Sequence, residues 1–245
     1  MPSHIEAERL KRQREIALGY RIFASLRWGD LGDGHITASD PELTDHIWLL
    51  KYPYGFERAT VADLVLVNPA GRVVDLDGNV DNAAEINDTA YNIHHPIHEA
   101  RDDVVGVAHT HTQWGTPFCA TGRPILPITQ EACSFHERWA LFDDDEVQVL
   151  NRDGGVRIAH ALGEKTVGLL RNHGLISTGP SVGEAIAAFV TVERVCEALM
   201  KSPDAEPISD AAAIIARDDL ERMRAFEVSF QFLVSRHVGD ARVVG

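Results

Sequence analysis

The sequence predicts an α/β fold in which helices cover a mixed sheet, and two observations support this. Short apolar, β-branched runs alternate with longer segments in which apolar residues recur at helical spacing. Some neighbouring runs are separated only by turns, as in hairpins. With 245 residues and 44% apolar content, the chain could form one large domain or two small ones. We find no linker that favours two.

The first half begins with a predicted helix. Residues 4–27 are rich in Glu, Arg, Leu and Ala and have a helical apolar stripe, and a glycine-dense turn follows at 28–34. Residues 35–39 predict a short strand. Residues 62–67 predict another strand that ends in a turn, and residues 72–74 return as its hairpin partner.

The second half alternates helical and extended patterns. Pro180 and Ser181 suit the first turn of a long helix that they begin. The predicted helices are 83–100, near 155–163, 180–200 and 209 to about 233, and the predicted strands are 104–111 and 166–174.

Two histidines end one of these strands and a third ends another. Side chains at i and i+2 of a strand lie on the same side, so His109 and His111 could bind one cation. His173 could complete an open site of the catalytic kind. Twelve histidines occur in the chain, and one strand-end histidine alone is more often a surface or core residue. The three together predict one divalent ion per chain, which could be zinc, manganese, iron or cobalt.

Composition excludes several classes of protein. A net charge of −14 disfavours a nucleic-acid partner, because binding phosphates needs clustered Lys and Arg. No apolar run approaches the roughly 20 residues that cross a bilayer, so no membrane partner is expected. The three cysteines are widely spaced, and the first residues include no apolar targeting stretch. These features predict a cytoplasmic protein with a small-molecule partner.

Four ordered motifs resemble the class II aldolase/adducin family over about residues 15–200. The motifs are Gly34-His-Ile-Thr-Ala-Ser39, Ile97-His-Glu-Ala-Arg-Asp-Asp-Val104, Val107-Ala-His-Thr-His111 and Leu170-Arg-Asn-His-Gly-Leu175. The resemblance implies a single-domain α/β/α sandwich with a central mixed, largely antiparallel sheet, spanning residues 1–245 with a helical tail at about 205–240. It also implies a homotetramer with the metal near a subunit boundary, its ligands falling on His109, His111 and His173.

Two departures from the family pattern affect the expected substrate. An acidic residue usually lies nineteen positions before the first histidine of the pair, where this chain has Ala90. A Gly-Asn turn that helps to bind phosphate is replaced by Gly34-His35, and only Thr89 keeps a hydroxyl at the companion pair. We therefore expect an unphosphorylated hydroxy or keto acid. Gly34, His35 and Thr89 are candidates for binding it, and Arg171 could bind its carboxylate or form a surface ion pair.

Another side chain must then transfer protons, and five residues are candidates. His94 and His98 are four residues apart on a predicted helix, so they share a face that points toward the site or packs on the sheet. Glu131 and His136 could reach a neighbouring site. The five candidates are His35, His94, His98, Glu131 and His136.

The expected activity is carbon–carbon bond cleavage by a divalent-metal-dependent lyase. A metal with three imidazoles could stabilise the enolate formed in aldol cleavage or decarboxylation. A sugar-phosphate aldolase or epimerase, or a metal-dependent oxygenase of the same family, is the alternative enzyme. A non-catalytic adducin-like interaction module is a different alternative: three converging imidazoles argue against it, and the loss of the acidic residue at Ala90 argues for it.

Overall fold

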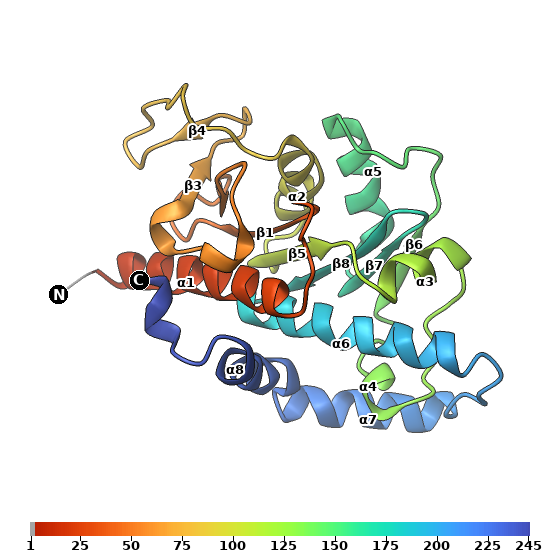
Figure 1. Cartoon of the computed structure of the whole chain (residues 1–245). Coiled ribbons are helices and arrows are strands. Elements are labelled where there is room, and N and C mark those ends of the chain that lie inside the picture. The colour runs from red at the N-terminus through yellow and green to blue at the C-terminus, as the bar shows by residue number, and fades with distance from the viewer. Residues whose placement is uncertain (1–2) are drawn as a thin grey trace.

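An eight-stranded sheet forms the centre of the structure, a computed structural model that describes residues 3–245 (Figure 1). The strand order is β4-β3-β2-β1-β5-β8-β7-β6. Neighbouring strands pair antiparallel, except for the parallel pair β6 and β7. The strands are β1 Gly34–Ser39, β2 Ile47–Leu50, β3 Leu64–Val67, β4 Val73–Val74, β5 Gly106–Thr110, β6 Trp139–Phe142, β7 Val167–Leu170 and β8 Gly174–Gly179.

Helices cover both faces of this sheet (Figure 1). On one face, α1 and α6 pack on the central strands, α8 packs against α6, and α7 contacts α8. On the other face, α2 packs on β1 and contacts α5, which packs on β6 and β7. The helices are α1 His4–Ser25, α2 Asp88–Ala100, α3 Gly115–Thr121, α4 Gln130–Cys133, α5 Arg152–Leu162, α6 Val182–Lys201, α7 Asp210–Arg222 and α8 Ala225–His237. Three short 3₁₀ helices are η1 Phe56–Arg58, η2 Val61–Asp63 and η3 Ala241–Val244.

Side chains alternate along β1, so apolar residues point to one face of the sheet and polar residues to the other. Ile36 and Ala38 belong to the core that α1 and α6 share with the sheet. His35 and Thr37 face the other way, toward α2, because successive strand residues point to opposite faces. The sheet therefore has an apolar face at β1 under α1 and a polar one under α2.

The two helices on the polar face lie against each other at a glycine. A Cβ atom on Gly155 of α5 would lie 1.7 Å from the carbonyl oxygen of Asn92 in α2, so only glycine permits this approach. Asn87 caps the N-terminus of α2 by accepting a hydrogen bond from the Thr89 amide. These contacts fix the helix that presents His94 and His98 to the sheet.

The α/β/α architecture predicted from the sequence is confirmed, but several boundaries differ. The run predicted as one strand over 166–174 is two strands, β7 and β8, with a turn at 171–173 between them. The predicted strand 104–111 is shorter, so His111 lies just beyond β5. The predicted helix over 209–233 is two helices that meet at Arg224, whose φ of 52° lies in the left-handed region and interrupts the helix.

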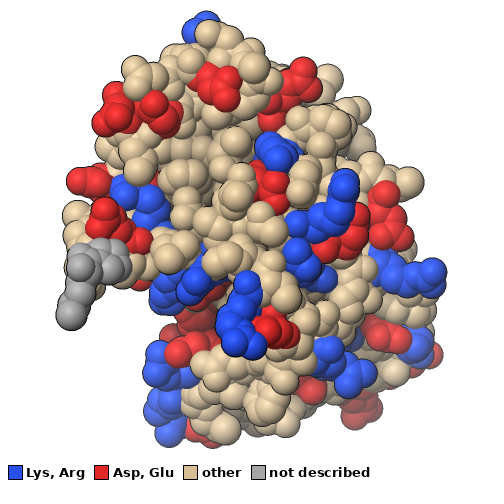
Figure 2. Space-filling model, turned by 60° about the vertical axis from the view of Figure 1, so that its left-hand side comes forward, with Lys and Arg blue, Asp and Glu red and all other residues tan. Residues whose placement is uncertain are grey.

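The surface agrees with the charge pattern of the sequence. Basic and acidic side chains are interspersed on the face shown in Figure 2, rather than gathered into one basic field. Among residues 3–245, no helix combines the length and apolar character needed to span a bilayer.

Candidate metal centre

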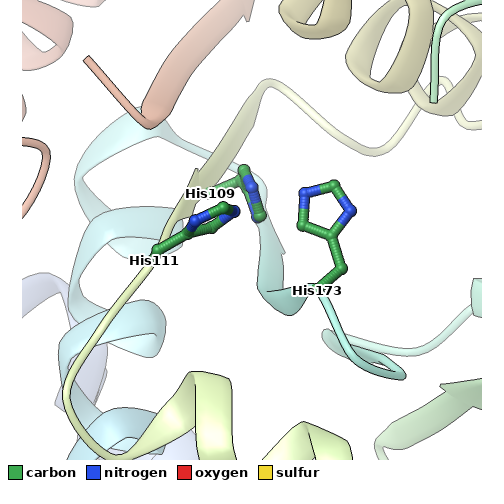
Figure 3. A group of neighbouring side chains, drawn as sticks. All are labelled: His109, His111 and His173. Atoms are coloured by element: carbon green, nitrogen blue, oxygen red, sulfur yellow. The ribbon is translucent and has the colours of Figure 1, made fainter. Parts of the chain in front are cut away.

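Three imidazoles from two segments of the chain meet where the central strands β5 and β8 approach each other (Figure 3). His109 is on β5, His111 follows it, and His173 lies in the turn between β7 and β8. One ring nitrogen from each residue lies within 4.8 Å of the other two. Three imidazole nitrogens this close together could hold one divalent ion.

The turn that carries His173 has a left-handed residue before the histidine. The His173 amide donates a hydrogen bond to the Leu170 carbonyl over 3.0 Å, which closes the turn. Asn172 has a φ of 59°, a conformation that asparagine adopts more readily than most residues. Strand β8 then pairs with β5 so that Leu175 lies opposite Thr110, which brings the turn beside the histidine pair.

Two neighbouring oxygens orient the imidazoles of the pair. The Nδ1–H of His109 donates to the Leu175 carbonyl over 2.7 Å. The Nδ1 atom of His111 lies 3.5 Å from a carboxylate oxygen of Asp33. Partners on Nδ1 leave Nε2 as the metal-binding nitrogen, an arrangement common around metal-ligating histidines. Sequence reasoning assigned Asp33 only to a turn and missed this contact.

The surroundings of His109 and His173 favour the neutral form of these two rings, which is the form that binds metal. Burial holds the pKa of His109 well below its usual value, and the neighbouring histidines lower it further. Burial, with a smaller contribution from His111, lowers the pKa of His173 to about 4. The donor set therefore fits a divalent ion that accepts imidazole nitrogen.

His35 lies directly beside this cluster on the adjacent strand. It is opposite His109 in the antiparallel pair of β1 and β5, and the two ring centroids are 4.8 Å apart. The preceding Gly34 is required by packing, because a Cβ there would lie 2.5 Å from the Thr110 hydroxyl. His35 is 3% exposed and contributes to the wall of a cavity of about 500 Å³.

Aromatic rings and charged side chains both contribute to the wall of this cavity. Gly34, His35 and Ala90 form part of its wall, which also carries two basic and two acidic side chains, Lys51, Arg58, Asp30 and Glu57. The Lys51 ammonium is 2.7 Å from Asp63 and lies over the ring of Tyr54. The aromatic lining residues are Tyr20, Trp28, Tyr52, Tyr54 and Phe56.

The structure places the two helix histidines against the sheet. His94 Nε2 is 2.8 Å from His35 Nδ1, and His94 Nδ1 is 2.9 Å from the Thr37 hydroxyl. His98 Nε2 is 2.9 Å from the same hydroxyl, and its Nδ1 is 3.3 Å from the Val104 carbonyl. Both rings are thus connected to His35 by hydrogen bonds, and neither belongs to the triad.

Four other predicted site residues lie elsewhere or have partners of their own. Glu131 is exposed on α4, which packs on α6 and α7, and His136 lies 3.8 Å from Asp210. Within one chain these two are not brought to the triad, so reaching a neighbouring site stays a prediction about an assembly. The Thr89 hydroxyl donates to Asn87, and Arg171 pairs with Asp143. Their substrate-binding roles also stay predictions.

Ala90 is buried where the resemblance implies an acidic residue. It is 0% exposed and belongs to an apolar cluster with Ile47, Leu49, Val67 and Val73. The site thus has a methyl group at this position, and the polar group nearest the triad from β1 is the imidazole of His35.

A buried carboxylate supports the loop that follows the histidine pair. Glu193 of α6, 4% exposed, accepts hydrogen bonds from the Thr112 hydroxyl over 2.6 Å and from the amides of Trp114 and Gly115 over 2.9 and 2.6 Å. Burial raises the pKa of Glu193, while these hydrogen bonds oppose the rise. Glu193 lies about eighty residues from this loop in the sequence, so the contact could not be predicted from the sequence.

Known proteins resemble the chain along most of its length. It is 38% identical over 210 residues to 4-hydroxy-3-prenylphenylpyruvate oxygenase/4-hydroxy-3-prenylbenzoate synthase of Streptomyces roseochromogenus, covering 85% of this chain and 73% of that protein. It is 37% identical over 210 residues to the decarboxylase NovR of Streptomyces niveus, covering 85% and 75%. The L-fuculose 1-phosphate aldolase from Glaciozyma antarctica superposes with a TM-score of 0.84 at 29% identity, covering 96% and 91%.

The family model described as the class II aldolase and adducin N-terminal domain matches residues 14–200. That span includes β1, the triad and the whole of the sheet, and it agrees with the range over which the motifs resemble the family. The chain therefore belongs to the class II aldolase and adducin family.

Proposed function

We propose that this protein is a divalent-metal-dependent carbon–carbon lyase that acts on an unphosphorylated hydroxy or keto acid. The observation that carries this proposal is the convergence of three imidazoles beside His35, which lines a cavity of about 500 Å³. The reaction is aldol cleavage or decarboxylation, which share one chemical need: negative charge that develops on the substrate must be stabilised. The similarity to the decarboxylase NovR supports the second.

The roles follow from position in the site. His109, His111 and His173 would hold the ion, which when bound supplies positive charge to a chelated substrate oxygen. His35, between the triad and the cavity, accepts the proton of the substrate hydroxyl through Nε2. As the O–H bond breaks, the proton moves to that nitrogen and the electron pair stays on the oxygen.

An aromatic substituent suits the cavity. Its rings offer stacking surfaces, and Lys51 and Arg58, which now pair with Asp63 and Glu57, could exchange these partners for a substrate carboxylate. The relative named for 4-hydroxy-3-prenylphenylpyruvate supports an aromatic acid as well. We therefore propose an aryl-substituted hydroxy or keto acid as the substrate class, and a homotetramer as the active assembly.

A metal-dependent oxygenase is the second candidate. The observation that favours it is the 38% identity to a protein whose name includes an oxygenase activity. A sugar-phosphate aldolase has the support of the superposition on L-fuculose 1-phosphate aldolase, but Ala90 and the Gly34-His35 turn disfavour it. Neither alternative changes which three residues hold the ion.

Metal analysis joined to a product screen tests the proposal. Purified protein should contain about one divalent ion per chain, and the double variant His109→Ala/His111→Ala should lose it. His160→Ala, an exposed histidine on α5, is the matched control and should keep the ion. Unchanged metal in the double variant would refute the ligand assignment.

The screen uses aryl and aliphatic hydroxy and keto acids, with and without oxygen, and measures carbon dioxide and pyruvate. We expect one of these products from an aryl acid under anaerobic conditions. Turnover only in the presence of oxygen would establish the oxygenase instead. A metal-loaded protein that converts none of the acids would favour the interaction module.

A further inference from the structure

A continuous chain of buried hydrogen bonds leads from a backbone carbonyl to His35. It runs from the Val104 carbonyl to His98 Nδ1 (3.3 Å), from His98 Nε2 to the Thr37 hydroxyl (2.9 Å), and from that hydroxyl to His94 Nδ1 (2.9 Å). It ends with His94 Nε2 and His35 Nδ1, 2.8 Å apart. The three imidazoles and the hydroxyl are all at most 7% exposed.

The carbonyl end of this chain can only accept a hydrogen bond, and this settles the direction of the first two bonds. His98 must carry its proton on Nδ1 to donate to the Val104 carbonyl. A neutral imidazole has one N–H, so His98 Nε2 is bare and accepts from the hydroxyl of Thr37.

The single proton of that hydroxyl then settles the rest. Because Thr37 donates to His98, its oxygen must accept from His94, which therefore carries its proton on Nδ1. His94 Nε2 is then bare and accepts from Nδ1–H of His35. The last nitrogen, His35 Nε2, is left without a proton, and no other residue in the range 3–245 forms a hydrogen bond with it.

The environment keeps the rings of His94 and His98 neutral, as the directional assignment requires. Burial lowers the pKa of His94 well below the usual value, and the neighbouring histidines act in the same direction. Burial lowers the pKa of His98 to about 4, against a small opposing effect of its bond to Val104. Water cannot compete for the bonds, because the rings lie between α2 and the sheet.

We propose that His98, Thr37 and His94 are positioning residues: their hydrogen bonds, which begin at the Val104 carbonyl, fix His35 as the tautomer with a bare Nε2. The tautomer itself follows from the hydrogen bonds alone. Its use as the acceptor of the substrate's hydroxyl proton rests on the proposed lyase function. The roles differ: His35 touches the substrate, and the other three act only through His35.

The tautomers can be measured directly by ¹⁵N NMR of histidine-labelled protein loaded with zinc, since protonated and bare ring nitrogens differ in chemical shift. Single His→Gln variants assign the signals. We expect His35, His94 and His98 each to carry the proton on Nδ1. A proton on Nε2 of neutral His35 would overturn the proposal without any use of activity.

Thr37→Val tests the transmission, because valine keeps the shape of the side chain and removes the hydroxyl. His98 should keep its proton on Nδ1, held by Val104, while His35 and His94 should become mixtures of tautomers. Thr37→Ser, which restores the hydroxyl, should restore the wild-type spectrum. The matched control is Thr178→Val, a buried threonine on β8 whose hydroxyl donates to the carbonyls of Lys165 and Thr166; it should leave the three rings unchanged.

Activity gives an independent second readout once a substrate is known. Thr37→Val should lower kcat about tenfold or more with metal content unchanged, and Thr37→Ser should recover it. Identical spectra of His35 and His94 in Thr37→Val and wild type would refute the transmission. Failure of the lyase screen with the expected spectra would refute the proposed function and leave the tautomer assignment standing.

Discussion

His35 and Ala90 together change which residue of the site can transfer a proton. The family resemblance implies a carboxylate near the cation, and this chain has a buried methyl group there instead. A polar group is supplied from β1, where the His35 ring lies 4.8 Å from His109. In the proposed mechanism the proton-transfer residue is therefore on β1, at His35, and not at position 90 of α2.

Ala90→Glu is expected to harm the protein rather than repair it. A carboxylate among Ile47, Leu49 and Val67 would lose hydration, so the free energy of unfolding should fall by roughly 2–4 kcal/mol. Turnover should not rise. Urea denaturation and the product assay measure both, and Ala90→Gln separates the effect of charge from that of size. A large gain in turnover would instead reveal a damaged aldolase site.

At the residue scale, sequence reasoning reached the side chains whose spacing is informative. His109 and His111 follow the two-residue repeat of a strand, and His173 ends another run, so their meeting could be anticipated. Asp33 and Glu193 could not be found in this way, because their importance lies in contacts between distant segments. The partners of His94 also needed coordinates, since the helical repeat left two orientations open.

At the scale of elements, helix α6 supports the segment that follows His111 through one buried carboxylate, Glu193. Glu193 accepts three hydrogen bonds from the segment after β5, so its loss leaves two amides and a hydroxyl without their partner. The element therefore connects the apolar core to the position of His111.

Glu193→Ala should lower the free energy of unfolding by roughly 2–4 kcal/mol and weaken metal binding about tenfold, because buried unpaired amides are costly and the loop becomes free to move. Urea denaturation and metal titration check these two effects. Glu197→Ala on the same helix, an exposed residue paired with Lys201, is the control. Equal metal affinity in the Glu193 and Glu197 variants would contradict the supporting role.

Element boundaries were predictable where pattern and local signals coincide, as in α6, which begins after Pro180 and the Ser181 cap. They were missed where elements are short. Strand β2 has four residues, all buried, and lacks the alternation that marks a half-exposed strand. Strand β6 has four half-buried residues and is held in place by β7. Tertiary pairing, rather than local pattern, creates both.

For the whole molecule, the buried histidines predict a loss of stability in mild acid. The folded state depresses the pKa of His98 to about 4, whereas an unfolded histidine titrates near 6.5. Between these values the unfolded chain binds more protons, so stability is full above about pH 6.5 and falls as the pH approaches 4.

This one ring should contribute on the order of 3 kcal/mol to that loss, and His35, His94 and His109 act in the same direction. Urea denaturation with chelator present at about pH 7.5 and about pH 5 measures the change. His98→Gln should show a shallower dependence. An equal free energy of unfolding at both values would contradict the prediction.

The assembly is a second property of the whole molecule. Light scattering at micromolar concentration should give a mass about four times the 27.0 kDa of one chain. Apolar side chains exposed on and beside α7 and α8, such as Ile215, Met223 and Phe232, offer surface that subunit contacts could bury. A monomeric mass would contradict the expected homotetramer.

The alignment of β1 on β5 has a consequence for how such a site can change over time. A shift of one residue in the pairing of β1 with β5 would turn Ile36 toward the histidine triad. The same shift would place the imidazole of His35 in the apolar core beneath α1. Any larger residue at position 34 would collide with Thr110, so a substitution of Gly34 would disturb both the local packing and the register of the two strands. Mutations that keep every histidine but change the register of β1 on β5 would therefore still abolish the site.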